Sequence, residues 1–257
     1  MEELKLIYNK LNKLKLSGIA ESLEEKIKKA GTERWSYSVF LDFLLTEELD
    51  RRGSKQLTKR LAKSHLNLDK TLETFEFDFN EKIQTGLIKE LGGCDFIRQK
   101  QNVFILGPSG VGKSHIAQSL GHEACRKNFE VLFFDMQDLF EWLHCGKGDG
   151  TYRKRLEAVI KTQLLVIDDF ALEPLSESQQ SEFYQIIAKK YEKSSLIITS
   201  NRDFSEWGGC FSNTLLAMAT LDRLVHKGIK IVIEGKSYRL EEFKKRTCVK
   251  QKMKKID

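Results

Sequence analysis

The sequence predicts an α/β fold, a parallel β-sheet flanked by helices, preceded by a small all-helical domain. From about residue 81 onward, short apolar runs alternate with helical stretches, and this alternation is typical of a parallel sheet. The runs are apolar throughout, as expected for strands buried on both faces. Before residue 81 the pattern is helical, without strand runs. We therefore expect a helical N-terminal domain at 1–66, a linker at 67–80 and an α/β domain at 81–257 that ends in a basic tail.

The N-terminal region has apolar residues at helical spacing over residues 4–14 and again over residues 19–27. Ser38 is a candidate N-cap for a third helix, which we expect to end near Gly53 and to be followed by a basic helix reaching about Lys63. The linker contains alternating aromatic residues, which we expect to pack on the surface of the next domain: Phe75, Phe77 and Phe79.

Five apolar runs are candidate strands of the α/β domain. They are NVFIL at 102–106, VLFFD at 131–135, LLVID at 164–168, LIITS at 196–200 and KIVIEG at 230–235. None approaches the ~18 apolar residues of a transmembrane helix. The five cysteines are scattered without metal-ligand spacing, and their odd number does not fit a disulfide framework. We therefore expect a cytoplasmic protein with reduced thiols and no membrane association.

The charge is unevenly distributed along the chain. The net charge is +6, yet residues 51–63 carry six basic residues and residues 244–255 carry seven, with no acid in either segment. Basic patches of this kind favour a polyanionic partner such as DNA, although a solvated helix face or tail explains either patch alone equally well. The candidate DNA contacts in the first patch are Arg51, Arg52, Lys55, Lys59 and Arg60.

The strongest motif is GPSGVGKS at residues 107–114, directly after a predicted strand. It fits the phosphate-binding loop of nucleotide-binding proteins, in which backbone N–H groups and a helix N-terminus surround the phosphates. Lys113 would reach the β- and γ-phosphates of ATP, and the Ser114 hydroxyl would bind Mg²⁺. The candidate nucleotide-binding residues are Gly107, Pro108, Ser109, Gly110, Val111, Gly112, Lys113, Ser114 and His115.

A second motif is the strand LLVID followed by a further aspartate. A buried strand that ends in an acid delivers a carboxylate to the crevice at the carboxyl edge of the sheet. We expect Asp168 to hold Mg²⁺ and Asp169 to polarise the attacking water. Aspartate is also a common turn former, so this prediction depends on the phosphate-binding loop found upstream.

Two further side chains are candidates with simple structural alternatives. Asn201 leaves the strand next to the acidic one and could orient water or sense the γ-phosphate, or could be a turn residue. Arg223, in LDRL of the helix before the last strand, is by itself better explained by a surface ion pair.

Taken together, these motifs resemble the AAA+ ATPases of the IstB/DnaC type, which are transposition helper proteins of insertion sequences and replicative helicase loaders. The resemblance covers nearly the whole chain, through LKLSGIAESLEE, TFEFDF, GPSGVGKSHIAQSLG, LLVIDDF, PLSESQQSEFYQIIAKKYE, LIITSNRDFSEW, ATLDRLVH and EGKSYR. The N-terminal helical segment and the SNR…EW stretch resemble the transposition helpers more than the loaders.

This resemblance implies an AAA+ domain that binds ATP between neighbouring subunits of a homo-oligomer. It implies that Asn201 is the first sensor residue, that Arg223 is an arginine finger, and that Arg202 and Arg239 sense nucleotide or the interface. It also implies ATP-dependent assembly on double-stranded DNA and recruitment of a transposase. Many AAA+ proteins have glutamate where this chain has Asp169, so we expect slow, DNA-stimulated hydrolysis.

In related AAA+ initiators, a helical insertion after the second core strand lines the central channel. The corresponding segment of this chain is rich in glycine and basic residues, and it could equally be a solvated helix face. Its candidate DNA contacts are Lys147, Arg153, Lys154 and Arg155.

Three alternatives remain open at the level of sequence. A replicative helicase loader would share the fold and the mechanism. A small-molecule kinase would need a second substrate site, which the sequence does not indicate. A passive DNA-coating protein would use ATP only as an assembly switch.

Overall fold

The structure, a computed structural model, describes residues 2–244. Contacts divide the chain into two compact units, Met1–Lys59 and Arg60–Asp257, which we call the helical unit and the α/β unit. The division falls inside a helix and earlier than the boundary predicted at residue 66, because Arg60 is already buried in the α/β unit. The basic segment 244–255, apart from its first residue, lies outside the described residues.

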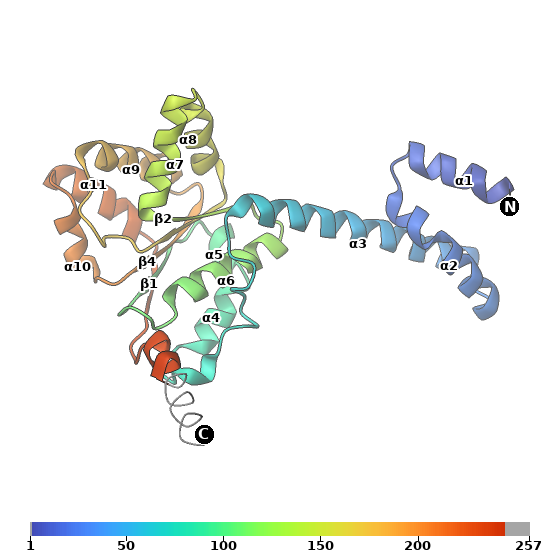
Figure 1. Ribbon diagram of the computed structural model, residues 1–257, viewed down its shortest axis with the longest axis horizontal. Coiled ribbons are helices and arrows are strands. Elements are labelled where there is room, and N and C mark those ends of the chain that lie inside the picture. The colour runs from blue at the N-terminus through green and yellow to red at the C-terminus, as the bar shows by residue number, and fades with distance from the viewer. Residues whose placement is uncertain (1, 245–257) are drawn as a thin grey trace, which may run out of the picture. The chain divides into compact units, whose positions relative to one another are not determined.

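Within the described residues, the helical unit contains α1 (Glu2–Lys13), α2 (Ser17–Glu33) and most of α3 (Tyr37–Ser64). Its core is small: Ile19, Leu23 and Leu44 are buried and pack with partly buried neighbours. Helix α3 is continuous (Figure 1), and its range includes Gly53, so the helix end predicted near Gly53 is wrong. A glycine inside a helix costs about 1 kcal/mol relative to alanine, and the helix formers around it outweigh that cost.

The α/β unit contains a five-stranded parallel sheet in the order β2-β3-β4-β1-β5 within residues 2–244. The strands are β1 (Val103–Leu106), β2 (Val131–Asp135), β3 (Leu164–Asp168), β4 (Ser195–Ser200) and β5 (Ile229–Val232). Each lies at a predicted apolar run, which confirms the predicted α/β class. The central strands β1, β3 and β4 are buried throughout, whereas the edge strands β2 and β5 are partly exposed.

Helices cover both faces of the sheet (Figure 1). Alternate side chains of a strand point to opposite faces, and Phe104, Leu165 and Ile198 belong to the core shared with α7, α9, α10 and α11. Helix α6 contacts β1 to β4. The helices are α4 (Thr85–Leu91), α5 (Asp95–Arg98), α6 (Lys113–Arg126), α7 (Met136–Gly148), α8 (Tyr152–Lys161), α9 (Glu177–Lys190), α10 (Phe204–Trp207) and α11 (Thr214–Val225), with 3₁₀ turns η1 (Phe77–Phe79) and η2 (Gly208–Cys210).

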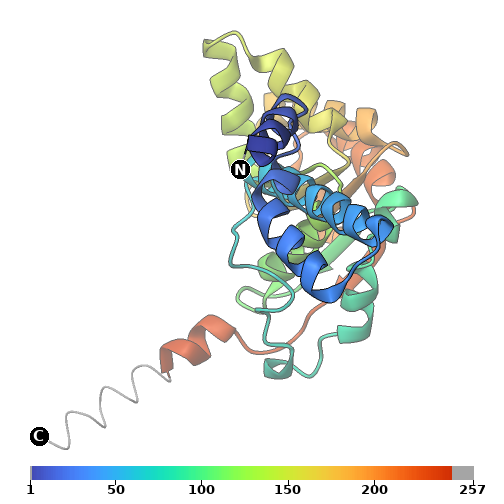
Figure 2. The same ribbon diagram turned by 90° about the vertical axis from the view of Figure 1, so that its right-hand side faces the viewer.

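Two connections matter for the site. The segment between α3 and α4 runs over the α/β unit, where Phe75 packs edge-on against His115 and Phe79 against Tyr238. The α7–α8 hairpin projects from the α/β unit in both views (Figures 1 and 2). Among residues 2–244, every helix is too short or too polar to cross a lipid bilayer.

Candidate functional site

The loop at 107–112 leaves the carboxyl end of β1 and leads directly into α6. Gly107, Gly110 and Gly112 have φ angles of +150°, +83° and +99°, a region that L-residues with side chains rarely adopt. These angles allow successive backbone N–H groups to point into one concavity, which is the geometry of an anion-binding loop. Helix α6 adds the positive end of its dipole at Lys113.

The same glycines are needed because other segments lie close to them. A Cβ at Gly112 would lie 2.8 Å from the Phe75 ring, and a Cβ at Gly110 would collide with Ser237. The backbone N–H of Tyr238 donates to the Gly110 carbonyl at 2.9 Å. The linker and the helical segment 238–244 therefore both reach the loop.

Lys113, the first residue of α6, is buried beside this loop. Its side-chain Nζ donates to the Pro108 carbonyl at 2.9 Å and to Asn201 Oδ1 at 2.5 Å. Burial lowers the pKa of Lys113, and the negative charge of Asp169 opposes that effect. Asn201 follows β4, the neighbour of β1, so the sheet order brings together two residues that the sequence predicted to act on one phosphate.

The two predicted acids lie at the carboxyl end of β3. Asp168 is 4% exposed, and it accepts a short hydrogen bond from the Thr199 hydroxyl. The Thr199 hydroxyl also accepts from the backbone N–H of Asp169 at 3.0 Å. Asp169 has a φ of +51°, so the chain turns sharply there, and burial together with the charge of Asp168 raises its pKa.

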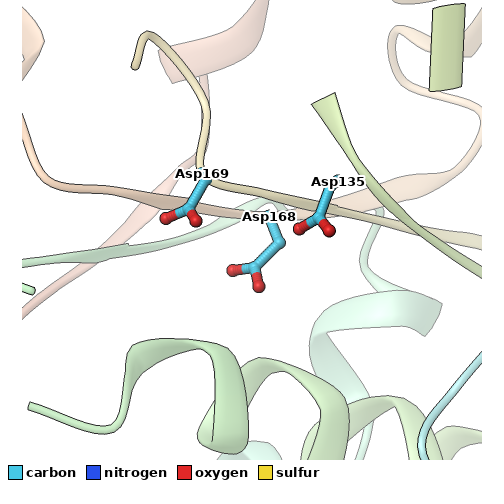
Figure 3. A group of neighbouring side chains, drawn as sticks. All are labelled: Asp135, Asp168 and Asp169. Atoms are coloured by element: carbon cyan, nitrogen blue, oxygen red, sulfur yellow. The ribbon is translucent and has the colours of Figure 1, made fainter. Parts of the chain in front are cut away.

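Sequence reasoning missed two residues of this cluster, Asp135 and Thr199. Asp135 ends β2 in register with Asp168, and the carboxylates of Asp135, Asp168 and Asp169 lie within 4.8 Å of one another (Figure 3). Burial and the neighbouring carboxylates raise the pKa of Asp135. A sequence signal for each residue was present. VLFFD ends in an acid as LLVID does, and Thr199 comes two residues before the predicted Asn201.

Three other predicted nucleotide residues occupy different positions around the loop. His115 turns away from the concavity, and its Nε2 hydrogen-bonds the Thr71 carbonyl at 3.0 Å. Arg239 is exposed in the segment 238–244, where its charge adds to the lowering of the Lys113 pKa by burial and partly opposes the rise in the Asp169 pKa. Arg202 is exposed just after β4, where its carbonyl accepts from Trp207 Nε1 at 3.3 Å.

Arg223 lies at the opposite edge of the sheet from the loop. The carbonyl of its neighbour Leu224 accepts from the side chain of Asn102, the residue just before β1, at 2.8 Å. The phosphate-binding loop begins after the other end of that strand, about 13 Å away at 3.3 Å per residue. The Arg223 guanidinium lies over the Tyr184 ring at 5.4 Å and donates to the Ala219 carbonyl.

The basic residues of α3 differ in burial and in ion pairing. Arg60, predicted as a DNA contact, is buried and donates to the Cys125 carbonyl and the Asn128 side chain, which leaves little of its guanidinium exposed. Arg51 pairs with Glu21, and Arg52 pairs with Glu48. Arg52, Lys55 and Lys59 are exposed, and of these Arg52 is held by its ion pair.

The basic residues of the α7–α8 hairpin also include some that are paired with acids and some that are exposed. Lys147 donates to Glu182 at 2.9 Å, and Arg155 pairs with Asp149 and lies over the Trp142 ring. Arg153 and Lys154 are exposed on α8. Gly146 has a packing role, since a Cβ there would lie 2.9 Å from the Tyr152 backbone.

Comparison with known protein families matches residues 9–246 to the IstB-like ATP binding proteins. The chain is 34% identical over 245 residues to an ATP-binding protein of insertion sequence IS21 from Pseudomonas aeruginosa, covering 95% of this chain and 91% of that protein. It is 35% identical over 236 residues to the counterpart in insertion sequence IS5376 of Geobacillus stearothermophilus, covering 92% and 94%.

Solved structures with a similar fold include AMPPCP-bound DnaA from Aquifex aeolicus, with a TM-score of 0.56 and 26% identity. That match covers 71% of this chain and 56% of the DnaA chain. The DnaC helicase loader has a TM-score of 0.54 at 24% identity, covering 65% of this chain and 97% of the loader, and this likeness concerns the fold. With a family match across nearly its whole length, the chain belongs to the IstB-like ATP binding proteins, the AAA+ proteins of insertion sequences.

Proposed function

We propose that this protein is a Mg²⁺-dependent ATPase that assembles on double-stranded DNA and supports a transposase encoded by the same insertion sequence. The observation that carries the proposal is the separation of its charged groups. The loop, Lys113 and the acids gather at the carboxyl edge of the sheet, whereas Arg223 lies at the amino edge. A single copy of such a chain would bind nucleotide, but it would complete its hydrolytic site only with a second copy.

The residues present fit Mg²⁺ and ATP. The glycine angles form a concavity that a Cβ would obstruct, and carboxylate and hydroxyl oxygens are the ligands that Mg²⁺ prefers. Ser114 and Asp168 would hold the ion, Asp168 already oriented by Thr199. Bound Mg²⁺ would neutralise charge on the phosphate oxygens. Lys113 would bind the β- and γ-phosphates, and Arg239 would add positive charge near them.

Within one chain, the hydrolytic role falls to Asp169 and Asn201. Asp169 would accept a proton from the attacking water, and its raised pKa brings that carboxylate closer to the range of an effective base. Asn201 holds the Lys113 ammonium and would orient water or sense the γ-phosphate, with Arg202 as a nearby sensor. Aspartate reaches one methylene less far than glutamate, so we expect slow turnover.

The second copy would supply Arg223 as an arginine finger. Helix α11 carries an exposed apolar stripe of Leu215, Met218 and Val225, with Leu215 79% exposed. An apolar stripe on the helix that bears the finger supports a protein contact there. Beside Asp169 lies an acidic pocket of about 260 Å³, with Asp138 and Glu173 in its wall, and its charge complements a guanidinium.

The DNA contacts would be Arg153 and Lys154 on the projecting α8, with Lys55 and Lys59 adding affinity from the helical unit. These side chains are exposed, and phosphate contacts need only accessible positive charge. Lys147 and Arg155 are held by acids in the same chain, so they would contribute less. A location in the cytoplasm, where a bacterial chromosome lies, fits this role.

The relatives connect the proposal to transposition, since the curated proteins named above are ATP-binding proteins of insertion sequences. We test it by measuring ATP hydrolysis with and without duplex DNA, and by imaging the protein on DNA by electron microscopy in ATP and in ADP. We expect DNA to stimulate hydrolysis and oligomers to form on DNA in ATP alone. Turnover indifferent to DNA, with no assembly in ATP, would contradict the proposal.

A further inference from the structure

A row of polar side chains on α6 binds the backbone of the segment that follows α3. The row is His115, Gln118, Ser119 and His122, which we call the α6 clamp, and the segment is residues 67–75, which we call the strap. Positions separated by three and four residues share one face of a helix, so the clamp is a continuous stripe. Its helix begins at Lys113, inside the phosphate-binding loop.

Each member of the clamp reaches a backbone group of the strap. Gln118 Oε1 accepts from the Asn67 N–H, and His122 Nε2 hydrogen-bonds the Asn67 carbonyl, both at 2.9 Å. Ser119 Oγ donates to the Lys70 carbonyl at 3.3 Å. His115 Nε2 hydrogen-bonds the Thr71 carbonyl at 3.0 Å.

Three of these side chains are almost fully buried. Gln118 and His122 are each 3% exposed and Ser119 is 0% exposed, and buried polar groups are retained when they are hydrogen-bonded. Because each clamp residue hydrogen-bonds a backbone group, the clamp fixes the path and register of the strap through its main chain. An apolar helix face would bury the strap without fixing its register.

The end of the strap contacts the phosphate-binding loop itself. The Phe75 ring lies so close to Gly112 that a Cβ there would be 2.8 Å from it. The same ring packs edge-on against His115, with ring centroids 5.1 Å apart. His115 therefore touches the strap at three residues: the Thr71 carbonyl, the Thr74 hydroxyl at 3.3 Å and the Phe75 ring. A displacement of Gly112 or of the first turn of α6 must be followed by Phe75.

From this geometry we propose that His115 is a positioning residue of the nucleotide site, and that ATP bound at the loop tightens the α6 clamp on the strap. This inference rests on the proposed nucleotide site. Phosphates that fix the loop and the first turn of α6 also fix the surface to which Phe75 and the Thr71 carbonyl dock. Because α3 leads directly into the strap, strap tightening is a physical link from nucleotide to the helical unit.

Trypsin cleavage after Lys70 tests the proposal, because proteolysis there requires the strap to leave the clamp. The full-length chain is digested with and without a non-hydrolysable ATP analogue plus Mg²⁺, and fragments ending at Lys70 are followed by mass spectrometry. We expect the analogue to slow cleavage at Lys70 by about fivefold or more in the wild type. His115→Leu should abolish this slowing, whereas His115→Gln, which keeps a side-chain N–H donor, should restore part of it.

The matched control is His144→Leu, the same substitution on α7, where His144 binds Glu182. It should retain the full slowing. Analogue affinity is measured on each variant by fluorescence titration, and cleavage rates are compared at saturation. Equal cleavage rates with and without bound analogue in the wild type, or full slowing in His115→Leu, would overturn the inference and leave the proposed function standing. A wild type that does not bind the analogue would refute the proposed function itself.

Discussion

At the carboxyl edge of the central sheet, charged side chains are oriented by partners in the same chain. Lys113 donates to Asn201, and Asp168 accepts from Thr199. At the amino edge, Arg223 donates to a carbonyl of its own helix and lies over Tyr184. One edge thus carries groups already held by hydrogen bonds, to which we assign phosphate and Mg²⁺ binding, and the other carries a cation placed away from them.

Under the proposed function, this difference separates nucleotide binding from hydrolysis. Substitutions at the carboxyl edge should act within the chain that carries them, whereas substitutions at Arg223 should act on a neighbour. The helical segment on α11 that presents Arg223 also presents Leu215 and Met218 to solvent, so assembly and finger delivery would use one surface. The following substitutions test the comparison, beginning with the largest expected effect.

Replacing Arg223 with alanine should reduce ATP turnover by about 10³- to 10⁵-fold, the range for arginine fingers. ATP affinity of the isolated chain should remain unchanged, because Arg223 lies at the opposite sheet edge from the loop. Turnover on saturating duplex DNA and nucleotide titration give the two values. A loss of affinity equal to the loss of turnover would place Arg223 in the binding site of its own chain.

Asp169→Ala should lower turnover by about 10²- to 10⁴-fold, the usual contribution of a general base. ATP should stay bound, because Lys113 and the loop remain intact. Asp169→Asn serves as the matched variant, since it keeps the size of the side chain and removes its charge. Single-turnover hydrolysis measures the chemical step, and a wild-type rate for Asp169→Ala would assign the base to another acid, with Asp135 the first to test.

Neutralising Arg153 and Lys154 together, each to glutamine, should weaken binding to all duplexes alike. The slope of log affinity against log salt should fall by about two, at roughly 0.9 per lost phosphate contact. Lys147→Gln should change the slope less, because Glu182 already holds that ammonium. Affinity is measured across salt concentrations with ATP present. An unchanged slope would move the DNA to another surface, and Lys55 and Lys59 would be neutralised next.

The smallest effect concerns Lys190, which is fully buried, with its Nζ donating to the Val159 and Thr162 carbonyls at the end of α8. Burial lowers its pKa to about 7. At pH values between about 7, the pKa of Lys190 in the folded chain, and about 10.4, the ordinary lysine pKa, the unfolded chain binds a proton that the folded chain does not. Stability should therefore rise with pH through this window and lose that contribution as pH falls toward 7.

The contribution from Lys190 amounts to at most about 1.4 kcal/mol per pH unit for one proton. Urea unfolding at pH 7 and pH 9 measures it, with Lys190→Met as the comparison. The wild type should gain more stability than the variant between these two values. An equal gain in both proteins would show that Lys190 keeps its proton in the folded state.

Much of the fold could be predicted because its signals are local. Buried parallel strands must be apolar on both faces, and the runs that became β1, β3 and β4 satisfy this. The break expected at Gly53 failed because a single glycine costs a long helix little. The burial of Arg60 could not be predicted, since its partners Cys125 and Asn128 are distant in sequence and meet it only through the packing of α3.

In the candidate site as well, residues within short motifs were predictable from the sequence, whereas residues brought together by the sheet order were not. Motif spacing predicted the loop, Lys113 and Asp168, because their chemistry depends on short stretches of chain. Asp135 and Thr199 were missed because their relevance comes from the sheet order, which places β2 and β4 on either side of β3. The sequence predicted His115 as a nucleotide ligand, whereas its side chain hydrogen-bonds the Thr71 carbonyl, a partner with no sequence signature.

The central claim is that hydrolysis takes place between two copies, one supplying the loop and the other supplying Arg223. Arg223→Ala protein keeps its loop, and Lys113→Ala protein keeps its finger but should lose tight ATP binding. Each variant alone should be inactive on DNA. Mixed in equal amounts, with co-assembly confirmed by fluorescence energy transfer, they should recover hydrolysis at interfaces that join an intact loop to an intact finger. Co-assembly without any recovered hydrolysis would contradict the claim.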